Sequence, residues 1–296
     1  MVGGLCPAHH PHARLKPPVV VTFVVHPQSV PLDPRPVTSA AIVAIIPARY
    51  ESTRLPGKPL ADINGRPMIE HVYRRAASAR SIGAVMVATD HELVARAVEA
   101  FGGNVRMTRT SHRSGSDRLA EVAEQLTCEI IVNVQGDEPL IEPAMIDEAV
   151  APLAEDPAIE ISTLRRRIED PADYLDPSVV KVVTDRNGFA LYFSRAPIPF
   201  ARGSAPPTSL GAPPALPRGQ VACKHIGLYV YRREALLRFA RLAPTPLEQA
   251  ESLEQLRALE HGFRLKVVET QYDSIGVDTL EDLERVRRRL ASAANG

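Results

Sequence analysis

Short apolar runs alternate with amphipathic stretches from residue 42 onward. Residues 42–46 are a continuous apolar run, and residues 84–89 and 130–134 are apolar except for Thr89 and Asn133, which is typical of strands that are buried on both faces. Between them, residues 91–101 and a stretch that opens at Pro67 carry apolar side chains at helical spacing. Because strands and helices alternate with short connections, the pattern predicts a parallel sheet that helices cover on both faces.

The second half of the chain has a different pattern. Asn187-Gly188 lies between two apolar segments, residues 179–183 and 189–193, and Asn-Gly in this position is a strong hairpin signal. Further elements are predicted as strands at 104–108, 225–231 and 265–268, and as helices from Ser114 or Ser116 to about 126, at 247–261 and at 280–290. We therefore predict an α/β fold: a Rossmann-like, mixed and mostly parallel sheet sandwiched by helices, with a smaller inserted second lobe at roughly 175–262.

The first forty residues differ in composition from the rest of the chain. Residues 1–40 are rich in proline, which excludes a continuous helix, and we predict a disordered extension there. A folded domain would then span residues 41–296. A second proline-rich stretch, residues 203–219, is predicted to be a surface loop.

The charges of the chain balance. Lys plus Arg and Asp plus Glu both number 35, so the formal net charge is zero. No global field favours nucleic acid or a membrane as a partner, so a bound anion must be held by local groups. Cys6, Cys128 and Cys223 are too far apart for a metal knuckle or a redox pair, which favours reduced thiols and a cytoplasmic protein.

The segment after the first predicted strand carries the strongest chemical signal. Residues 47–59 read Pro-Ala-Arg-Tyr-Glu-Ser-Thr-Arg-Leu-Pro-Gly-Lys-Pro and contain Gly57 with three cations, Arg49, Arg54 and Lys58. A bound triphosphate needs backbone N–H groups that approach it closely and cations that offset its charge. The Gly-Lys-Ser/Thr ending of a Walker loop is absent. A solvated loop with incidental charges is the alternative reading.

This loop resembles the signature of the sugar nucleotidylyltransferases, and within them that of the 3-deoxy-manno-octulosonate cytidylyltransferases (CMP-Kdo synthetases). The resemblance extends in order over roughly residues 42–290. It includes Ala88-Thr-Asp-His91, His112-Arg-Ser-Gly-Ser-Asp-Arg-Leu119, Asn133-Val-Gln-Gly-Asp-Glu-Pro139, Ala190-Leu-Tyr-Phe-Ser-Arg195, Lys224-His-Ile-Gly-Leu-Tyr229, Leu253-Glu-Gln-Leu-Arg257 and Gly276-Val-Asp-Thr279. The family catalyses attack by a sugar's anomeric hydroxyl on the α-phosphorus of CTP, with pyrophosphate as the leaving group.

The resemblance implies a Mg²⁺ cofactor with Asp137 and Asp278 as its ligands. Mg²⁺ is commonly bound by one or two carboxylates together with phosphate oxygens. From the residues alone, Asp137 could simply form the turn in Gly-Asp-Glu-Pro, and Asp278 could be the N-cap of the helix that follows it.

The resemblance also assigns nucleotide-binding residues. Arg49 and Lys58 would hold the triphosphate, while Ser52 would donate a hydrogen bond to it. Ser114, Gly115 and Gln135 are expected to read the cytosine, whose amino donor and carbonyl acceptor match an amide and backbone groups. Without the resemblance, Ser114 would be a helix cap.

An acid sugar needs a cation for its carboxylate and several donors and acceptors for its hydroxyls. The family positions that supply them are Arg118, Arg195, His225, Tyr229, Glu254 and Gln255. Adjacent helical residues point in different directions, so one of the last two could be structural. A histidine on an alternating strand, as at 225, is more often a satisfied core residue.

Three functions fit these features. The first is transfer of CMP from CTP to 3-deoxy-D-manno-octulosonate (Kdo), which would activate Kdo for lipopolysaccharide synthesis. The second is a cytidylyltransferase for another acid sugar, such as 8-amino-Kdo or sialic acid. The third is a non-catalytic nucleotide-binding regulator, against which the presence of Lys58, Asp137 and Asp278 argues. The family also implies a homodimer formed through the second lobe.

Overall fold

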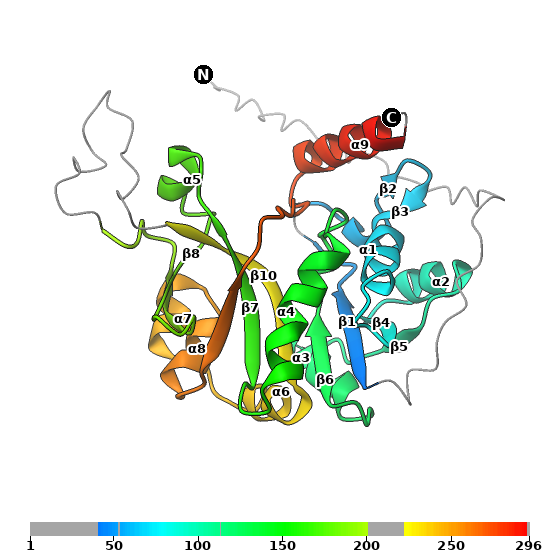
Figure 1. The fold of residues 1–296 in the computed structure, drawn as a ribbon. Helices are drawn as coiled ribbons and strands as arrows, with labels where there is room; N and C mark the ends of the chain where they lie inside the picture. Colours follow the sequence, from blue (N-terminus) through cyan, green and yellow to red (C-terminus); the bar gives the residue numbers. More distant parts are fainter. Residues whose placement is uncertain (1–40, 53, 113, 201–221, 295–296) are drawn as a thin grey trace, which may run out of the picture.

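The computed structural model describes residues 41–52, 54–112, 114–200 and 222–294 (Figure 1). The predicted extension at 1–40 and the predicted loop at 203–219 lie outside these residues.

One nine-stranded sheet runs through the structure (Figure 1). Its main path has the order β11-β7-β10-β6-β1-β4-β5, and β8 and β9 join it beside β10. The strands are β1 (Ile42–Ala48), β4 (Ala84–Thr89), β5 (Val105–Met107), β6 (Ile130–Asn133), β7 (Ile161–Arg167), β8 (Lys181–Thr184), β9 (Ala190–Ser194), β10 (Cys223–Arg232) and β11 (Leu265–Glu269).

Most neighbours along this path are parallel. The pairs β6–β1, β1–β4, β4–β5 and β11–β7 are parallel, whereas β10 is antiparallel to both β6 and β7. This confirms the predicted mixed, mostly parallel sheet. It also means that β1, β4, β6, β7 and β11 all end at one edge of the sheet, and ligands bind at this edge in open α/β folds.

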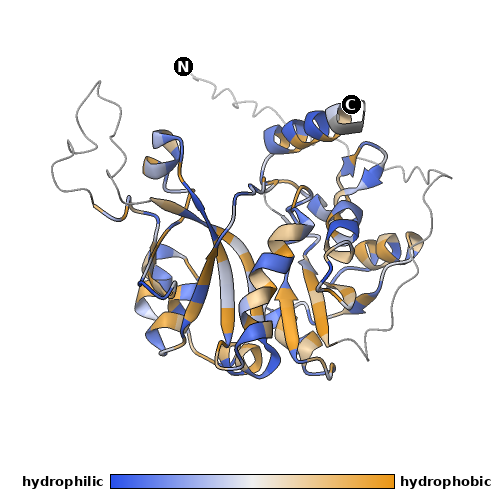
Figure 2. Ribbon diagram, in the orientation of Figure 1, coloured by the Kyte–Doolittle hydropathy of each residue, from blue (hydrophilic) through white to orange (hydrophobic). Residues whose placement is uncertain are grey.

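Helices cover both faces of the sheet. One face packs against α1 (Met68–Ala77), α2 (Glu92–Ala100) and α4 (Pro143–Glu155), and the other against α3 (Gly115–Ala123), α6 (Arg233–Phe239) and α8 (Gln255–Glu260). Ile46 in β1 faces the first layer, whereas the adjacent Ile45 faces the second, as the alternation along a strand requires. Apolar residues dominate the central strands in Figure 2.

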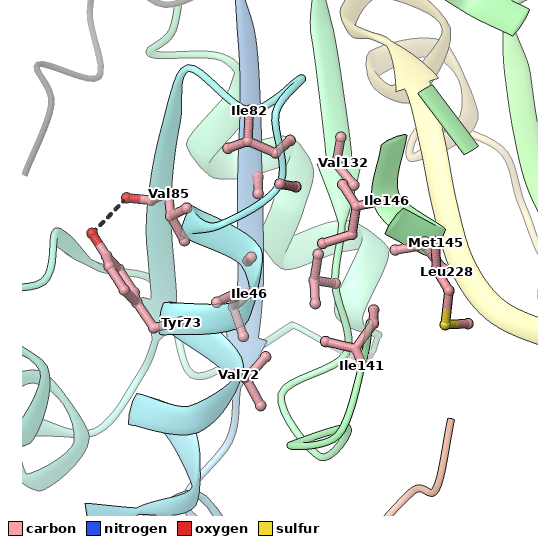
Figure 3. Close-up of a cluster of buried hydrophobic side chains, with 14 of the residues drawn as sticks. Ile46, Val72, Tyr73, Ile82, Val85, Val132, Ile141, Met145, Ile146 and Leu228 are labelled. Carbon is pink, nitrogen blue, oxygen red and sulfur yellow. Dashed lines mark hydrogen bonds between the residues drawn. The ribbon is translucent and has the colours of Figure 1, made fainter. Parts of the chain in front are cut away.

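The first of these layers shows how closely the elements pack (Figure 3). Ile46, Val72, Met145 and Leu228 come from β1, α1, α4 and β10 and are all completely or almost completely buried. Tyr73 fits the same layer because its hydroxyl donates a hydrogen bond of 3.1 Å to the carbonyl of Val85. The four elements therefore share one core that supports the ligand-binding edge.

The predicted second lobe, residues 175–262, shares the main sheet. It contains β8, β9, β10, α6, α7 (Pro246–Glu251) and α8, and β10 lies between β6 and β7. The single helix predicted at 247–261 is two helices, because Ser252 adopts a left-handed conformation with φ 52°. The described structure also has elements that we had not predicted, including α4, β7 and α5 (Pro171–Leu175).

The last described helix packs against the segment that follows β1. Helix α9 (Leu280–Ala294) lies beside the small sheet of β2 (Asp62–Ile63) and β3 (Arg66–Pro67), which follows the short 3-10 helix η2 (Lys58–Leu60). Leu283 and Val286 of α9 pack with Ile63 and Met68 in a separate apolar cluster. This packing brings the segment before α9 close to the loop that follows β1.

Candidate active site

The loops that carry the predicted phosphate and metal residues meet at the carboxyl edge of the sheet. A Cβ at Gly136 would lie 2.7 Å from the carbonyl oxygen of Pro47, so only glycine allows the loop after β6 to approach the loop after β1 this closely. Val277 donates a backbone hydrogen bond of 2.9 Å to the carbonyl of Asp137. Three segments far apart in the sequence thus form one site.

Lys58 is at the centre of this site. Its ammonium donates hydrogen bonds to Asp137 Oδ2 at 2.6 Å, to the carbonyl of Val277 at 2.8 Å and to Asp278 Oδ1 at 3.1 Å. Arg54 adds a second cation, 3.2 Å from Asp278 Oδ1. The structure therefore brings together three of the four residues that we predicted as catalytic.

Two carboxylates keep the side chain of Lys58 protonated although it is partly buried. Burial of its side chain disfavours the ammonium, but the nearby carboxylates of Asp137 and Asp278 outweigh burial and raise the pKa of Lys58 above its ordinary value. Lys58 is therefore positively charged at neutral pH and supplies a fixed cation at the ligand-binding edge.

Asp278 is not the side-chain cap of helix α9, which was the alternative to a metal ligand. Thr279 makes the helix cap, because its Oγ1 accepts a hydrogen bond of 3.2 Å from the backbone N–H of Asp282, and Asp282 accepts one from the N–H of Thr279 in return. The carboxylate of Asp278 points instead to Lys58 and Arg54. The carboxylate of Asp137 accepts a hydrogen bond from Lys58, and its backbone carbonyl accepts one from the N–H of Val277.

The chemistry of Asp137 and Asp278 fits Mg²⁺. Both carboxylates contact one cationic atom, Lys58 Nζ, so both can reach one cation, and their oxygens are ligands that Mg²⁺ accepts. Across the described residues, no group of three or more His, Cys, Asp or Glu side chains could hold a metal ion. Two carboxylates therefore leave coordination positions for substrate phosphates and water.

Glu138 is a part of this site that the sequence analysis did not single out. Burial, with the charge of Asp137 as a further cause, raises the pKa of Glu138 to about 7. Ser274 donates a hydrogen bond of 2.9 Å to its Oε2. The only signal in the sequence was its place beside Asp137 in the quoted motif.

Arg49 and Ser52 shape the loop after β1. Arg49 is exposed and its Nη2 donates a hydrogen bond of 3.1 Å to the carbonyl of His112, in the loop before α3. Ser52 Oγ accepts a hydrogen bond of 3.3 Å from the N–H of Leu55, which leaves its hydroxyl proton for another acceptor. Their contacts with a triphosphate stay predictions.

The three predicted cytosine-reading residues lie on adjoining segments. Ser114 caps α3: its Oγ accepts from the N–H of Asp117 at 3.1 Å in a capping box. A Cβ at Gly115 would contact the ring of Pro47 at 3.6 Å, and Gln135 Nε2 donates a hydrogen bond of 3.2 Å to the carbonyl of Gly227 in β10. Reading of the base by these residues stays a prediction.

His225 and Tyr229 form an aromatic wall on β10. Their rings are 5.3 Å apart, and Phe193 meets the ring of His225 edge-on at 5.0 Å. The hydroxyl of Thr163 lies 2.8 Å from the carbonyl of Leu228 and 2.9 Å from His225 Nε2. In the tautomer that protonates Nε2, Thr163 donates to Leu228 and accepts from His225, and Nδ1 keeps the lone pair.

Burial keeps these two side chains neutral. It lowers the pKa of His225 to about 3 and raises the pKa of Tyr229 well above its ordinary value. At neutral pH the site thus contains a histidine that can accept a hydrogen bond at Nδ1 and a tyrosine hydroxyl. His225 is a half-buried residue with one satisfied nitrogen and one available nitrogen.

Arg195 is held by neutral groups at its guanidinium. Its guanidinium donates hydrogen bonds to the carbonyls of Glu251 at 2.7 Å and Pro177 at 2.9 Å. Its backbone N–H donates a hydrogen bond of 2.9 Å to the carboxylate of Glu251, so one anion already lies beside this arginine. Glu254 is 31% exposed at its side chain, whereas the adjacent Gln255 is only 8% exposed, so the more accessible of the two is Glu254.

Arg118 is in a different environment from the one we predicted. It is completely buried in α3, where its guanidinium donates to Asp90 Oδ2 at 2.6 Å and to Thr108 Oγ1. Asp90 follows β4 and Thr108 follows β5. The residue therefore joins α3 to the ends of these strands and has no surface open to a ligand.

The fold and site can be compared with known proteins. Residues 43–269 match the family described as Cytidylyltransferase. A 3-deoxy-manno-octulosonate cytidylyltransferase of Geobacter sulfurreducens is 59% identical over 250 residues, which are 84% of this chain and 99% of that protein. The protein of the same name in Geobacter metallireducens is 60% identical over 251 residues, 84% of this chain and 98% of that one.

A solved structure agrees with these relatives. A CMP:2-keto-3-deoxy-manno-octonic acid synthetase complexed with CTP superposes with a TM-score of 0.78 at 43% identity, over 85% of this chain and 99% of that one. The family match over residues 43–269 includes Lys58 and Asp137. The chain belongs to the cytidylyltransferase family, and within it to the 3-deoxy-manno-octulosonate cytidylyltransferases.

Proposed function

We propose that this protein transfers CMP from CTP to the anomeric hydroxyl of Kdo and releases pyrophosphate. The observation that carries the proposal is the convergence of Lys58 with the carboxylates of Asp137 and Asp278 at the carboxyl edge of the sheet. A cation and two anions at one point suit a substrate that combines a triphosphate with a hard metal ion.

The reaction exchanges one bond to phosphorus for another. The anomeric oxygen forms a bond to the α-phosphorus while the bond from that phosphorus to the bridging oxygen of the β-phosphate breaks. Positioning and neutralisation of phosphate charge supply most of the catalysis in such reactions. Lys58 and Arg54 lie within 3.2 Å of Asp278 and, with Arg49 on the same loop, provide cations for the triphosphate.

Asp137 and Asp278 would hold Mg²⁺ together with oxygens of the triphosphate. When bound, the ion supplies positive charge next to the phosphates and orients them. The ammonium of Lys58 contacts the same carboxylate oxygens, so it and the ion would compete for them. This competition would leave Lys58 free to donate to phosphate.

The other end of the site suits an acid sugar. Among the described residues, the hydrogen bonds of the Arg195 guanidinium go to neutral backbone carbonyls, so a sugar carboxylate can pair with it. His225 Nδ1 and the carboxylate of Glu254 accept hydrogen bonds, and the Tyr229 hydroxyl donates or accepts one. These groups match a sugar with one carboxylate and many hydroxyls.

We further propose that the enzyme is a cytoplasmic homodimer whose product feeds lipopolysaccharide synthesis. Exposed leucines lie in the part predicted to form the dimer: Leu191 in β9 is 62% exposed and Leu247 in α7 is 40% exposed. Cys128 and Cys223 are free, buried thiols, in keeping with a reducing compartment. No helix among the described residues is long and apolar enough to cross a bilayer.

A panel of substrates tests the proposed function. Pyrophosphate release would be measured with Mg²⁺, each nucleoside triphosphate in turn and each of Kdo, 8-amino-Kdo and sialic acid. We expect CTP and Kdo to give the highest kcat/KM. A higher kcat/KM for sialic acid or 8-amino-Kdo would reassign the sugar, and release without any acid sugar would contradict the transfer reaction.

A further inference from the structure

The hydroxyl of Ser116 connects helix α3 to Glu254, a residue predicted to bind the sugar. Ser116 lies in the first turn of α3, directly after Gly115, and is only 4% exposed. Its Oγ donates a hydrogen bond of 2.8 Å to Oε2 of Glu254, which is 138 residues away in the sequence. The side chain of Ser116 therefore points toward Glu254, the residue predicted to bind the sugar.

The chemistry of the two partners fixes the direction of this hydrogen bond. An ionised carboxylate accepts hydrogen bonds and cannot donate one, whereas a serine hydroxyl has one proton to donate. Ser116 therefore donates its proton to Glu254.

The second oxygen of Glu254 is held as firmly as the first. Oε1 accepts a hydrogen bond of 2.9 Å from Nη2 of Arg257. Arg257 is itself buried and makes two hydrogen bonds, of 2.8 and 2.9 Å, to the carboxylate of Glu248, and its guanidinium lies 4.9 Å from the ring centre of Phe239. Such a bidentate, stacked arginine has little freedom to move.

The carboxylate of Glu254 still has an open side. It lines a pocket of about 510 Å³ together with Ser114 and Ser252. Ionised oxygens accept more than one hydrogen bond each, so Glu254 can accept from a ligand while Ser116 and Arg257 hold it. The network thus fixes the position of an acceptor without occupying it completely.

We propose that Ser116 is a positioning residue for the acid sugar: its hydroxyl fixes the Glu254 carboxylate and so ties sugar binding to the first turn of α3. The inference rests on the proposed function, in which Glu254 binds Kdo.

Ser116→Ala tests this role with little change to the helix, since alanine is a good helix former. At saturating CTP, we expect kcat/KM for Kdo to fall about 10-fold, the typical loss for a hydrogen bond to a charged group. The KM for CTP should change less than about 2-fold, because the hydrogen-bond partner of the hydroxyl is Glu254, a residue predicted to bind the sugar and not the nucleotide.

A double mutant separates positioning from structural support. If Ser116 acts through Glu254, then Ser116→Ala should cause no further loss of kcat/KM for Kdo in a Glu254→Ala background. The matched control is Ser162→Ala, which removes another buried hydroxyl whose Oγ donates 2.5 Å to the carbonyl of Ala149 under α4. It should lower the melting temperature and leave both substrate constants unchanged.

Two results would overturn the inference. One is an equal effect of Ser116→Ala on CTP and Kdo constants, which would indicate general damage to α3. The other is an additive loss in the double mutant, which would make Ser116 independent of Glu254. Failure of the proposed function is distinct from both, because the parent protein would then show no Kdo-dependent pyrophosphate release.

Discussion

Replacing Asp137 with asparagine removes one negative charge and keeps the size of the side chain. Asp137 contacts Lys58 at 2.6 Å, and the two side chains are 34% and 16% exposed. An amide oxygen is a weaker Mg²⁺ ligand than a carboxylate, so charge on the phosphates would be less well neutralised in the transition state. We expect turnover to fall roughly 100-fold or more, equivalent to about 3 kcal/mol.

Stability should change far less than turnover. The substitution removes a partly exposed ion pair, but Lys58 keeps Asp278 at 3.1 Å and the Val277 carbonyl at 2.8 Å. We expect a loss of about 1 kcal/mol, since partial exposure screens the pair. For a domain of this size that corresponds to a decrease in melting temperature of about 2–4 °C.

The assay is pyrophosphate release at several Mg²⁺ concentrations, with thermal melting in parallel. Asp147→Asn is a matched control, because this carboxylate on α4 accepts hydrogen bonds from the Ser81 N–H at 2.8 Å and hydroxyl at 2.7 Å, away from the site. The control should lose stability and keep its turnover. A folded Asp137→Asn protein with near-normal turnover at limiting Mg²⁺ would refute the assignment of Asp137 to the metal site.

Three further predictions concern pH, assembly and the amino-terminal segment. The pKa of His225 is lowered to about 3 in the folded protein but is about 6.5 when unfolded, so the unfolded state binds this proton first and His225 alone removes about 2 kcal/mol of stability between pH 7.5 and 5. Glu138, whose pKa is raised to about 7, acts in the opposite direction over the same range. The melting temperature of His225→Gln should therefore be higher at pH 5, relative to its value at pH 7.5, than that of the parent, and an identical change in both proteins would show that His225 does not contribute. Leu191→Asp should convert the dimer to a monomer by light scattering, whereas Leu280→Asp, at an equally exposed leucine of α9, should not; a dimer in both variants would place the interface elsewhere. Removing residues 1–39 should leave turnover and melting nearly unchanged because the first strand begins at Ile42, and a clear loss of stability would show that this segment packs on the domain.

Much of the fold was readable from the sequence because buried strands and amphipathic helices have distinct periods. Strand β4 has the predicted bounds, residues 84–89. The predicted helix at 247–261 was wrong in one respect, since Ser252 breaks it into two. A left-handed serine gives no periodic signal, because its neighbours on both sides keep helical spacing.

The candidate site was predictable to a different degree at each residue. Lys58, Asp137 and Asp278 come together because parallel strands end at one edge, which is a rule of topology. The burial of Arg118 was not predictable, since it depends on Asp90 and Thr108 after two other strands. The link from Ser116 to Glu254 likewise depends on tertiary packing between α3 and α8.

In the proposed reaction, the α-phosphate of CTP moves to the sugar. This transfer can be followed by incubating the protein with Mg²⁺, Kdo and CTP radiolabelled at the α-phosphate, and separating the products. We expect the label in a single product that contains both the nucleoside and Kdo, with an equal amount of unlabelled pyrophosphate. Label in a sugar-free nucleotide, or in free phosphate, would contradict the proposed transfer.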